Sequence, residues 1–355
     1  MNNDSVNNIN NVNNNNLNQG YVYNSYRPTN INNEVIDEER KKYLLEKEAK
    51  IQKNKKRKKI ISSVIGCIVF VFLVSYLFIN FFRPVKKDER LDKDSIHYVT
   101  DLYYSDGRFY EKYLSDKEKK IYKVLMEDFK DLKPVTEFNC IELGESDTSS
   151  CVGTIYRVID VILMEHPDLF WYRYSAFDER VTTESTTIPL RHRYVTKSKI
   201  YLYFVERRLH RKIDEIASNY EDLSDDKKVE AVYTWLGETT SYSTLIDDKA
   251  GTAWSALLDD DSVCAGFAAA SSLIFQYMGI ESHVVTGQTS GPHAWNFVKL
   301  DDGYYWYDST VAGSRGPEST NRGFYDGLLF GNTSQYQVEI ISLDDYKFGT
   351  KYIRN

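Results

Sequence analysis

The chain contains 355 residues, enough for two or three structural units of ordinary domain size. Aromatic residues make up 14% of it, so a folded part can bury many large side chains. The formal net charge of −7 excludes the basic balance of a general nucleic-acid binder, and we expect no nucleic-acid partner. The four cysteines are scattered and form no CxxC pair, which argues against a disulfide scaffold and a cysteine-ligated zinc site.

Residues 1–33 and 34–59 have polar and charged compositions that are typical of segments exposed to solvent. Residues 1–33 are rich in asparagine, and such a segment cannot bury enough apolar surface to offset the entropy of ordering it. We therefore predict a disordered Asn-rich tail. Residues 34–59 interleave Glu and Lys at helical spacings, which predicts a charged helix beside a membrane segment.

Residues 60–82 contain no charged side chain. A helix needs roughly 20 residues to cross about 30 Å of hydrocarbon, so this run predicts a single transmembrane helix in the lipid bilayer. No small-residue cleavage site follows it, which favours an uncleaved signal anchor. Six basic residues precede the run between 53 and 59, and three follow at 83, 86 and 87. The positive-inside rule then places the N-terminus in the cytoplasm and the C-terminal part outside the plasma membrane.

After a charged linker at 83–95, the sequence predicts an α+β subdomain over 96–222. Helical periodicity spans 115–133 and 154–166, and each stretch ends before a proline. Runs of aromatic and β-branched residues predict strands at 170–177, 188–196 and 200–205. Between these elements, Cys140 and Cys151 flank a polar loop. An extracytoplasmic location permits a disulfide, but the sequence leaves open whether the two cysteines pair or remain free thiols.

A cysteine at the start of a predicted helix is the first candidate for chemistry. Ser224 is predicted to cap one helix, and a second helix opens with Ser262 as its expected cap and ends at Gly279. Cys264 then lies in the first turn, where the helix dipole and free backbone N–H groups favour a thiolate. A cysteine nucleophile needs such a thiolate, although a lone cysteine is also common as a packing residue.

The strands that follow supply a base and a carboxylate. Three strands are predicted in succession, at 281–287, 293–300 and 304–308. A strict hairpin between the last two places Asp308 opposite Asn296 or Phe297, so we expect a bulge or a shear to bring it to His293. An imidazole that a carboxylate orients can take the proton of a thiol and later return it to a leaving group.

Five short motifs stand in order along this region. They are TAWSAL at 252–257, VCAGFA at 263–268, MGI at 278–280, HAWNFV at 293–298 and YYWYDST at 304–310. Together they resemble the transglutaminase-like superfamily of papain-type folds, over about residues 224–310. The resemblance implies an α+β catalytic domain at 223–355, with a nucleophile helix packed on an antiparallel sheet. It also implies that Cys264 is the nucleophile, His293 the base and Asp308 its orienting residue, with the Cys264 N–H as one oxyanion donor.

Other residues of the region have competing interpretations. Trp254 and Trp295 are candidates for substrate binding, although we favour packing under the nucleophile helix and over the hairpin. His283 competes with His293 as the base, but it lacks the aromatic and Asn neighbours of the family motif. After Asp308 the chain continues with Ser where many family members have Trp, which affects the expected cleft rather than the triad.

No metal or cofactor is expected. The acidic runs at 259–261 and 301–302 lack the spaced oxygen ligands of a calcium loop, so we interpret them as solvated turns. The motifs instead predict an acyl-transfer enzyme that forms a thioester at Cys264 with envelope or surface proteins or peptides. A transglutaminase and a cysteine peptidase share that intermediate, so the triad does not separate them. A catalytically silent binding module is the alternative from another class, although all three triad positions are intact.

Overall fold

The computed structural model describes residues 33–81, 109–177, 186–243, 249–315 and 323–353. The chain divides into two compact units, Met1–Arg83 and Pro84–Asn355. The predicted Asn-rich tail, up to residue 32, and the predicted linker at 83–95 lie outside the described residues. The predicted boundary between residues 222 and 223 falls within the second unit and stays a prediction.

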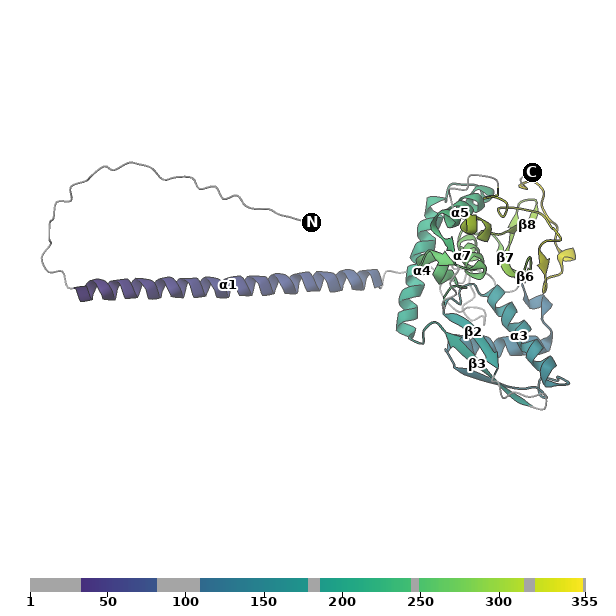
Figure 1. Cartoon of the computed structure of the whole chain (residues 1–355), viewed down its shortest axis with the longest axis horizontal. Coiled ribbons are helices and arrows are strands. Elements are labelled where there is room, and N and C mark those ends of the chain that lie inside the picture. The colour runs from purple at the N-terminus through teal and green to yellow at the C-terminus, as the bar shows by residue number, and fades with distance from the viewer. Residues whose placement is uncertain (1–32, 82–108, 178–185, 244–248, 316–322, 354–355) are drawn as a thin grey trace, which may run out of the picture. The chain divides into compact units, whose positions relative to one another are not determined.

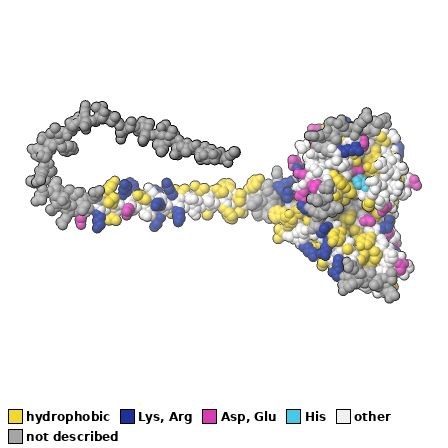
Figure 2. Space-filling model, viewed as in Figure 1, with side chains coloured by type: hydrophobic (Ala, Val, Ile, Leu, Met, Phe, Trp, Pro, Cys, Tyr) yellow, Lys and Arg dark blue, Asp and Glu magenta, His cyan; other side chains and the backbone are white. Residues whose placement is uncertain are grey.

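The first unit contains one long helix, α1, which spans Asn33–Phe81 (Figure 1). Its stretch Lys41–Tyr76 is long and apolar enough to cross a membrane. Lys and Arg side chains are concentrated on its N-terminal half, and hydrophobic side chains on the remainder (Figure 2). The predicted charged helix and the predicted membrane helix are therefore one element, because no proline stands between them.

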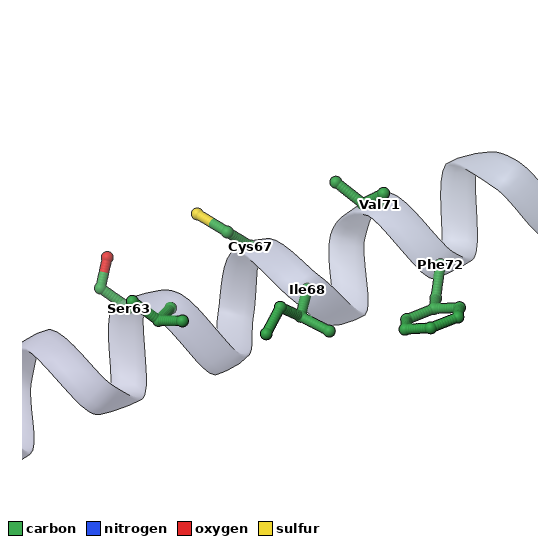
Figure 3. A pocket seen from close by; sticks show the side chains of 6 residues that line it. Ser63, Cys67, Ile68, Val71 and Phe72 are labelled. Atoms are coloured by element: carbon green, nitrogen blue, oxygen red, sulfur yellow. The ribbon is translucent and has the colours of Figure 1, made fainter.

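The apolar side chains of α1 point outward from a single helix. Ser63, Cys67 and Val71 project from one side of it, while Ile68 and Phe72 project from another (Figure 3). The shallow surface that these side chains line lies between successive turns of α1 alone. It has the form of a helix surface open to its surroundings rather than of an enclosed ligand site.

The second unit begins with helices and a small sheet. α2 (Asp116–Lys130) starts after Ser115, whose side chain forms a capping box with Glu118. α3 (Thr148–Glu165) starts six residues before the predicted Thr154, because Asp147 caps it there. An antiparallel sheet of order β1-β3-β2 follows, formed by β1 (Val135–Asn139), β2 (Tyr172–Phe177) and β3 (Thr187–Tyr194).

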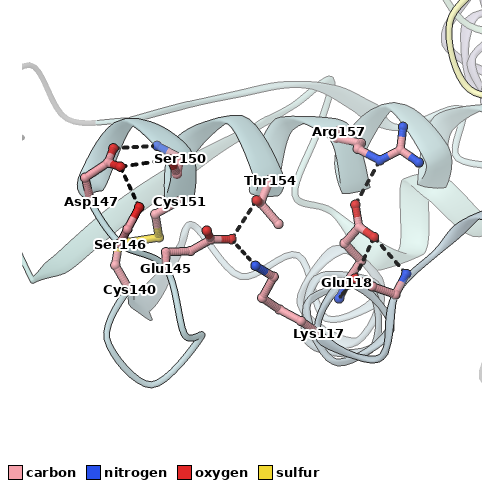
Figure 4. Close-up of polar contacts among 11 residues, drawn as sticks. Lys117, Glu118, Cys140, Glu145, Ser146, Asp147, Ser150, Cys151, Thr154 and Arg157 are labelled. Atoms are coloured by element: carbon pink, nitrogen blue, oxygen red, sulfur yellow. Dashed lines mark hydrogen bonds and ion pairs between the residues drawn. A yellow bond between two sulfur atoms is a disulfide. The ribbon is translucent and has the colours of Figure 1, made fainter.

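A disulfide joins Cys140, just after β1, to Cys151 near the start of α3 (Figure 4). The two Cα atoms are 5.6 Å apart, and both side chains are buried. Beside it, Glu145 accepts hydrogen bonds from Lys117 of α2 and from Thr154 of α3. The pairing that the sequence left open is therefore present, and it ties the sheet to the helix.

The predicted strand at 200–205 is wrong, because these residues form the start of α4 (Lys199–Asn219). Buried side chains recur every three or four residues along this helix, at Leu202, Val205, Leu209, Ile213 and Ile216. That spacing buries one face of a helix. Tyr201, Tyr203 and Phe204, whose aromatic character suggested a strand, remain partly exposed on the other face.

The candidate site lies where α7 (Cys264–Tyr277) packs on a four-stranded sheet of order β8-β7-β6-β9 (Figure 1). The strands are β6 (Ser282–Gln288), β7 (Pro292–Leu300), β8 (Gly303–Tyr307) and β9 (Gln337–Val338). The helices around them are α5 (Asp225–Thr239), α6 (Ala253–Leu258) and α8 (Thr310–Arg315). A short parallel pair, β4 (Ser241–Tyr242) and β5 (Asp261–Ser262), precedes α7. The predicted fold, a nucleophile helix on an antiparallel sheet, is confirmed.

Of the two predicted serine caps, Ser224 is confirmed in position and Ser262 is wrong. Ser224 occupies the N-cap position of α5, but its side chain makes no capping hydrogen bond. Val263 rather than Ser262 is the N-cap of α7. The Ser262 hydroxyl instead bonds to the Ser255 hydroxyl and donates to the carbonyl oxygen of Ala250. That hydroxyl therefore fixes the loop before the helix rather than the helix end.

Candidate active site

Cys264 is the first residue of α7 and is half-buried. Burial opposes its ionisation, but a hydrogen bond with His293 and the charge of that ring favour the thiolate. The backbone N–H groups of Ala294 and Ala265 also donate to the sulfur, and together these contacts lower the pKa of Cys264 below its ordinary value. The expected thiolate environment is therefore present, and strand β7 contributes to it together with the helix end.

His293 lies on β7, with its Nε2 atom 2.8 Å from Oδ2 of Asp308. Because Nε2 bonds the carboxylate, Nδ1 is the ring nitrogen left to contact the thiol. Burial lowers the pKa of His293, but the hydrogen bonds with Asp308 and Cys264 outweigh it and raise that pKa to about 10. The shifts of the two groups agree, and both favour an imidazolium beside a thiolate.

Three hydrogen bonds hold the carboxylate of Asp308, which is 2% exposed. Its Oδ2 atom accepts from His293 and from the hydroxyl of Tyr336, each at 2.8 Å. Its Oδ1 atom accepts from the backbone N–H of Thr310 at 3.1 Å. The structure thus joins the three predicted residues in one chain of contacts, from Cys264 through His293 to Asp308.

The contact between His293 and Asp308 forms without the predicted bulge. Strands β7 and β8 pair without interruption, and the last pair sets Asn296 opposite Tyr307. Asp308 therefore follows the last paired residue of β8, and it is not opposite Asn296 or Phe297 as expected. The expected register was wrong because Leu300 pairs with Gly303 across a two-residue turn, which sets Asn296 opposite Tyr307. Strand β8 ends at Tyr307, and the side chain of Asp308 reaches the imidazole from the next position.

Tyr242, which the sequence did not single out, lies against the candidate nucleophile. It stands on β4, opposite Ser262 of β5. Burial and the nearby Cys264 raise the pKa of Tyr242. Tyr242 is therefore a neighbour of the candidate nucleophile that the sequence did not reveal. No periodicity or motif marks this residue, because the short β4–β5 pairing brings it to the site.

The two tryptophans predicted as substrate contacts are both buried. Trp254 is 4% exposed and packs edge to face on Phe170, with 6.2 Å between ring centroids. Trp295 is 1% exposed and stacks on His293, with 5.9 Å between the rings. Trp295 therefore supports one face of the imidazole, while a substrate contact stays a prediction for either tryptophan.

The other candidate side chains have structural partners. The ring of His283 stacks on Phe109 at 3.5 Å, and its Nε2 atom lies 3.3 Å from a carboxylate oxygen of Glu281. In the second acidic run, Asp301 forms an ion pair with Lys351 at 2.7 Å. Across the residues that the structure describes, no three His, Cys, Asp or Glu side chains gather as ligands for a metal ion.

Residues 211–309, which include Cys264, His293 and Asp308, match the family model of the transglutaminase-like superfamily. This region belongs to that superfamily. The transglutaminase-like core therefore holds all three members of the contact chain, whereas Tyr336 follows the matched region. Among curated proteins, none is similar enough in sequence to match the chain.

Three solved structures resemble parts of the chain. A structure described as a TGase is 16% identical, with a TM-score of 0.29, and the match covers 42% of this chain and 46% of the other. The periplasmic domain of TgpA from Pseudomonas aeruginosa is 17% identical, with a TM-score of 0.25 and coverages of 43% and 68%. A putative cysteine protease from Cytophaga hutchinsonii is 15% identical, with a TM-score of 0.27 and coverages of 50% and 79%. The chain thus spans less than half of the TGase structure.

Proposed function

We propose that this protein is a cysteine acyltransferase or hydrolase that acts on proteins or peptides through a thioester at Cys264. The observation that carries the proposal is the contact chain of Cys264, His293 and Asp308 within the transglutaminase-like core. A thiolate beside an imidazolium, which a buried carboxylate orients, is the arrangement that covalent catalysis by cysteine requires.

The first half-reaction forms the thioester. The Cys264 sulfur attacks the carbonyl carbon of a glutamine side chain or a peptide bond, and the carbonyl oxygen becomes an oxyanion near the Cys264 N–H. His293 then gives its proton to the leaving nitrogen, the C–N bond breaks, and ammonia or an amine departs.

The second half-reaction reverses these proton transfers. Neutral His293 takes a proton from an amine or a water molecule, whose nitrogen or oxygen attacks the thioester carbon. The C–S bond then breaks, which restores the Cys264 thiolate and the imidazolium. An amine acceptor makes the enzyme a transglutaminase, and a peptide donor with water as acceptor makes it a cysteine peptidase.

We also propose that α1 anchors the enzyme in the plasma membrane, with the second unit outside the cytoplasm. The apolar stretch of α1 and the basic residues that precede it support this orientation. The disulfide between Cys140 and Cys151 supports it independently, because such bonds persist in oxidising compartments. Envelope or surface proteins and peptides are then the accessible substrates.

The test incubates the full chain in detergent with a glutamine-containing protein and a labelled primary amine. We expect amine incorporation or substrate cleavage, and Cys264→Ala should abolish either while keeping the fold, because the side chains are similar in size. Amine incorporation identifies a transglutaminase, and cleavage without it identifies a peptidase. Equal activity in the Cys264→Ala variant would contradict the proposed nucleophile. A folded chain without either activity would favour a silent binding module.

A further inference from the structure

The carboxylate of Asp308 has a partner from outside the matched core. The core ends at residue 309, whereas Tyr336 belongs to the chain that follows. Its hydroxyl donates to Oδ2 of Asp308 at 2.8 Å, the same oxygen that accepts from His293. Two donors from separate segments of the chain thus converge on one carboxylate oxygen.

An aromatic cluster holds the Tyr336 ring beside the imidazole. The ring centroid lies 5.0 Å from that of Trp295, edge to face, and 4.8 Å from that of Phe330. It is also 6.3 Å from the ring of His293, on which Trp295 stacks. Burial and the charge of Asp308 raise the pKa of Tyr336, so its hydroxyl keeps its proton and remains a donor.

The main chain of this segment is also attached beside the site. Strand β9 pairs with the end of β6, where Val338 lies opposite Gly287. On its other edge, Gly287 pairs with His293. The backbone N–H of Asp308 donates to the carbonyl oxygen of Gly327 at 2.7 Å. The segment that follows the core therefore contacts Asp308 through both its main chain and a side chain.

We propose that Tyr336 is a positioning residue, which holds the Asp308 carboxylate in the orientation that the His293 imidazolium needs. This inference rests on the proposed function, because it assigns a role to Tyr336 within the same triad. A second donor on the same oxygen restrains the rotation of the buried carboxylate and keeps it aligned with the imidazolium. The ionised carboxylate stabilises the imidazolium, which in turn stabilises the thiolate of Cys264.

The neighbouring groups define what a pH measurement will report. The titratable side chains that act on this site are Cys264, His293 and the tyrosines at 233, 242, 307 and 336. When Asp308 loses its hydrogen bond from the Tyr336 hydroxyl, the ionisation of Cys264 and His293 should change. The acid limb of the Cys264 reaction, where the thiolate forms, is therefore the informative quantity.

The test measures the pH dependence of Cys264 alkylation by iodoacetamide in the full chain. Tyr336→Phe keeps the ring and removes only the hydroxyl. We expect the acid limb to move up by about one pH unit, which on that limb means about a tenfold lower rate. Tyr304→Phe is the matched control, because it removes a hydroxyl that donates to the carboxylate of Glu281 at 2.6 Å. It should leave the profile unchanged.

Gly287→Ala tests the attachment of the segment and keeps every triad residue and Tyr336 in the sequence, but its Cβ atom would also lie 2.9 Å from the ring of Trp295, which stacks on His293, so its result is read together with that of Tyr336→Phe. A Cβ atom at Gly287 would overlap the carbonyl oxygen of Gln337, so the substitution displaces β9, and we expect the same upward move. A wild-type acid limb in Tyr336→Phe overturns the inference, even if thermal stability falls. This outcome differs from failure of the proposed function. If the proposed triad is wrong, His293→Ala would also leave the alkylation rate of Cys264 unchanged.

Discussion

In the pair of Cys264 and His293, each side chain changes the ionisation of the other. The thiol pKa is lowered although burial opposes it, and the imidazole pKa is raised to about 10 although burial opposes that too. Neither residue has this behaviour alone, since the hydrogen bond and the charge of its partner cause it. The reactivity of the thiol should therefore depend on the imidazole.

His293→Ala removes the charge and the hydrogen bond but leaves the two backbone donors to the sulfur. The thiol pKa should then rise toward its ordinary value, so alkylation at pH 7 should slow, by at most roughly thirtyfold. The difference should shrink as the pH rises toward 10, because the thiol then ionises without a partner. Rates with iodoacetamide across this range check the prediction, and equal rates at pH 7 would exclude coupling of the pair.

The residues of the contact chain could be predicted, and their tyrosine partners could not. Cys264, His293 and Asp308 stand within motifs whose order along the chain resembles a known family. Tyr242 and Tyr336 have no such local pattern, because a two-residue parallel pairing and an aromatic cluster bring them to the site. Sequence periodicity reports which face of an element is buried, and it carries no information on such long-range contacts.

At the scale of elements, α4 shows that the burial of one helix face outweighs the local strand propensity of aromatic residues. Its aromatic residues favoured a strand locally, but a helix at this position buries Leu202, Val205 and Leu209 on one face. The register of the hairpin was misjudged for a different reason. The turn sets it, and the pairing of Leu300 with Gly303 places Tyr307 opposite Asn296.

The start of α7 depends on a close approach that only glycine permits. A Cβ atom at Gly266 would overlap the hydroxyl of Ser262 and lie 2.7 Å from the carbonyl oxygen of Thr252. We expect Gly266→Ala to destabilise the fold by about 1–3 kcal/mol through overpacking. The matched control is Gly153→Ala in α3, where a Cβ meets nothing within 4 Å, and it should be neutral or stabilising. Urea unfolding compares them, and equal midpoints for Gly266→Ala and wild type would refute the expectation.

At the scale of the whole molecule, the disulfide makes the folding stability of the chain depend on an oxidising compartment. The bond between Cys140 and Cys151 closes a loop with a sequence separation of 11 residues. Replacing both cysteines by alanine should cost about 2–3 kcal/mol, by analogy with loops of similar length. A reductant should lower the unfolding midpoint of the wild type and leave that of the double variant unchanged. If reductant has no effect on the wild type, the disulfide does not contribute to stability.

The orientation of the chain in the membrane decides which substrates the site can meet. If the basic segment before residue 60 stays in the cytoplasm, Cys264 lies outside. A membrane-impermeant maleimide applied to intact cells should then label the chain, and Cys264→Ala should remove most of the label. The remaining described thiol, Cys67, lies in the apolar stretch of α1, where lipid would shield it, and Cys140 and Cys151 are paired. Labelling only after the cells are permeabilised would reverse the orientation and exclude surface proteins as substrates.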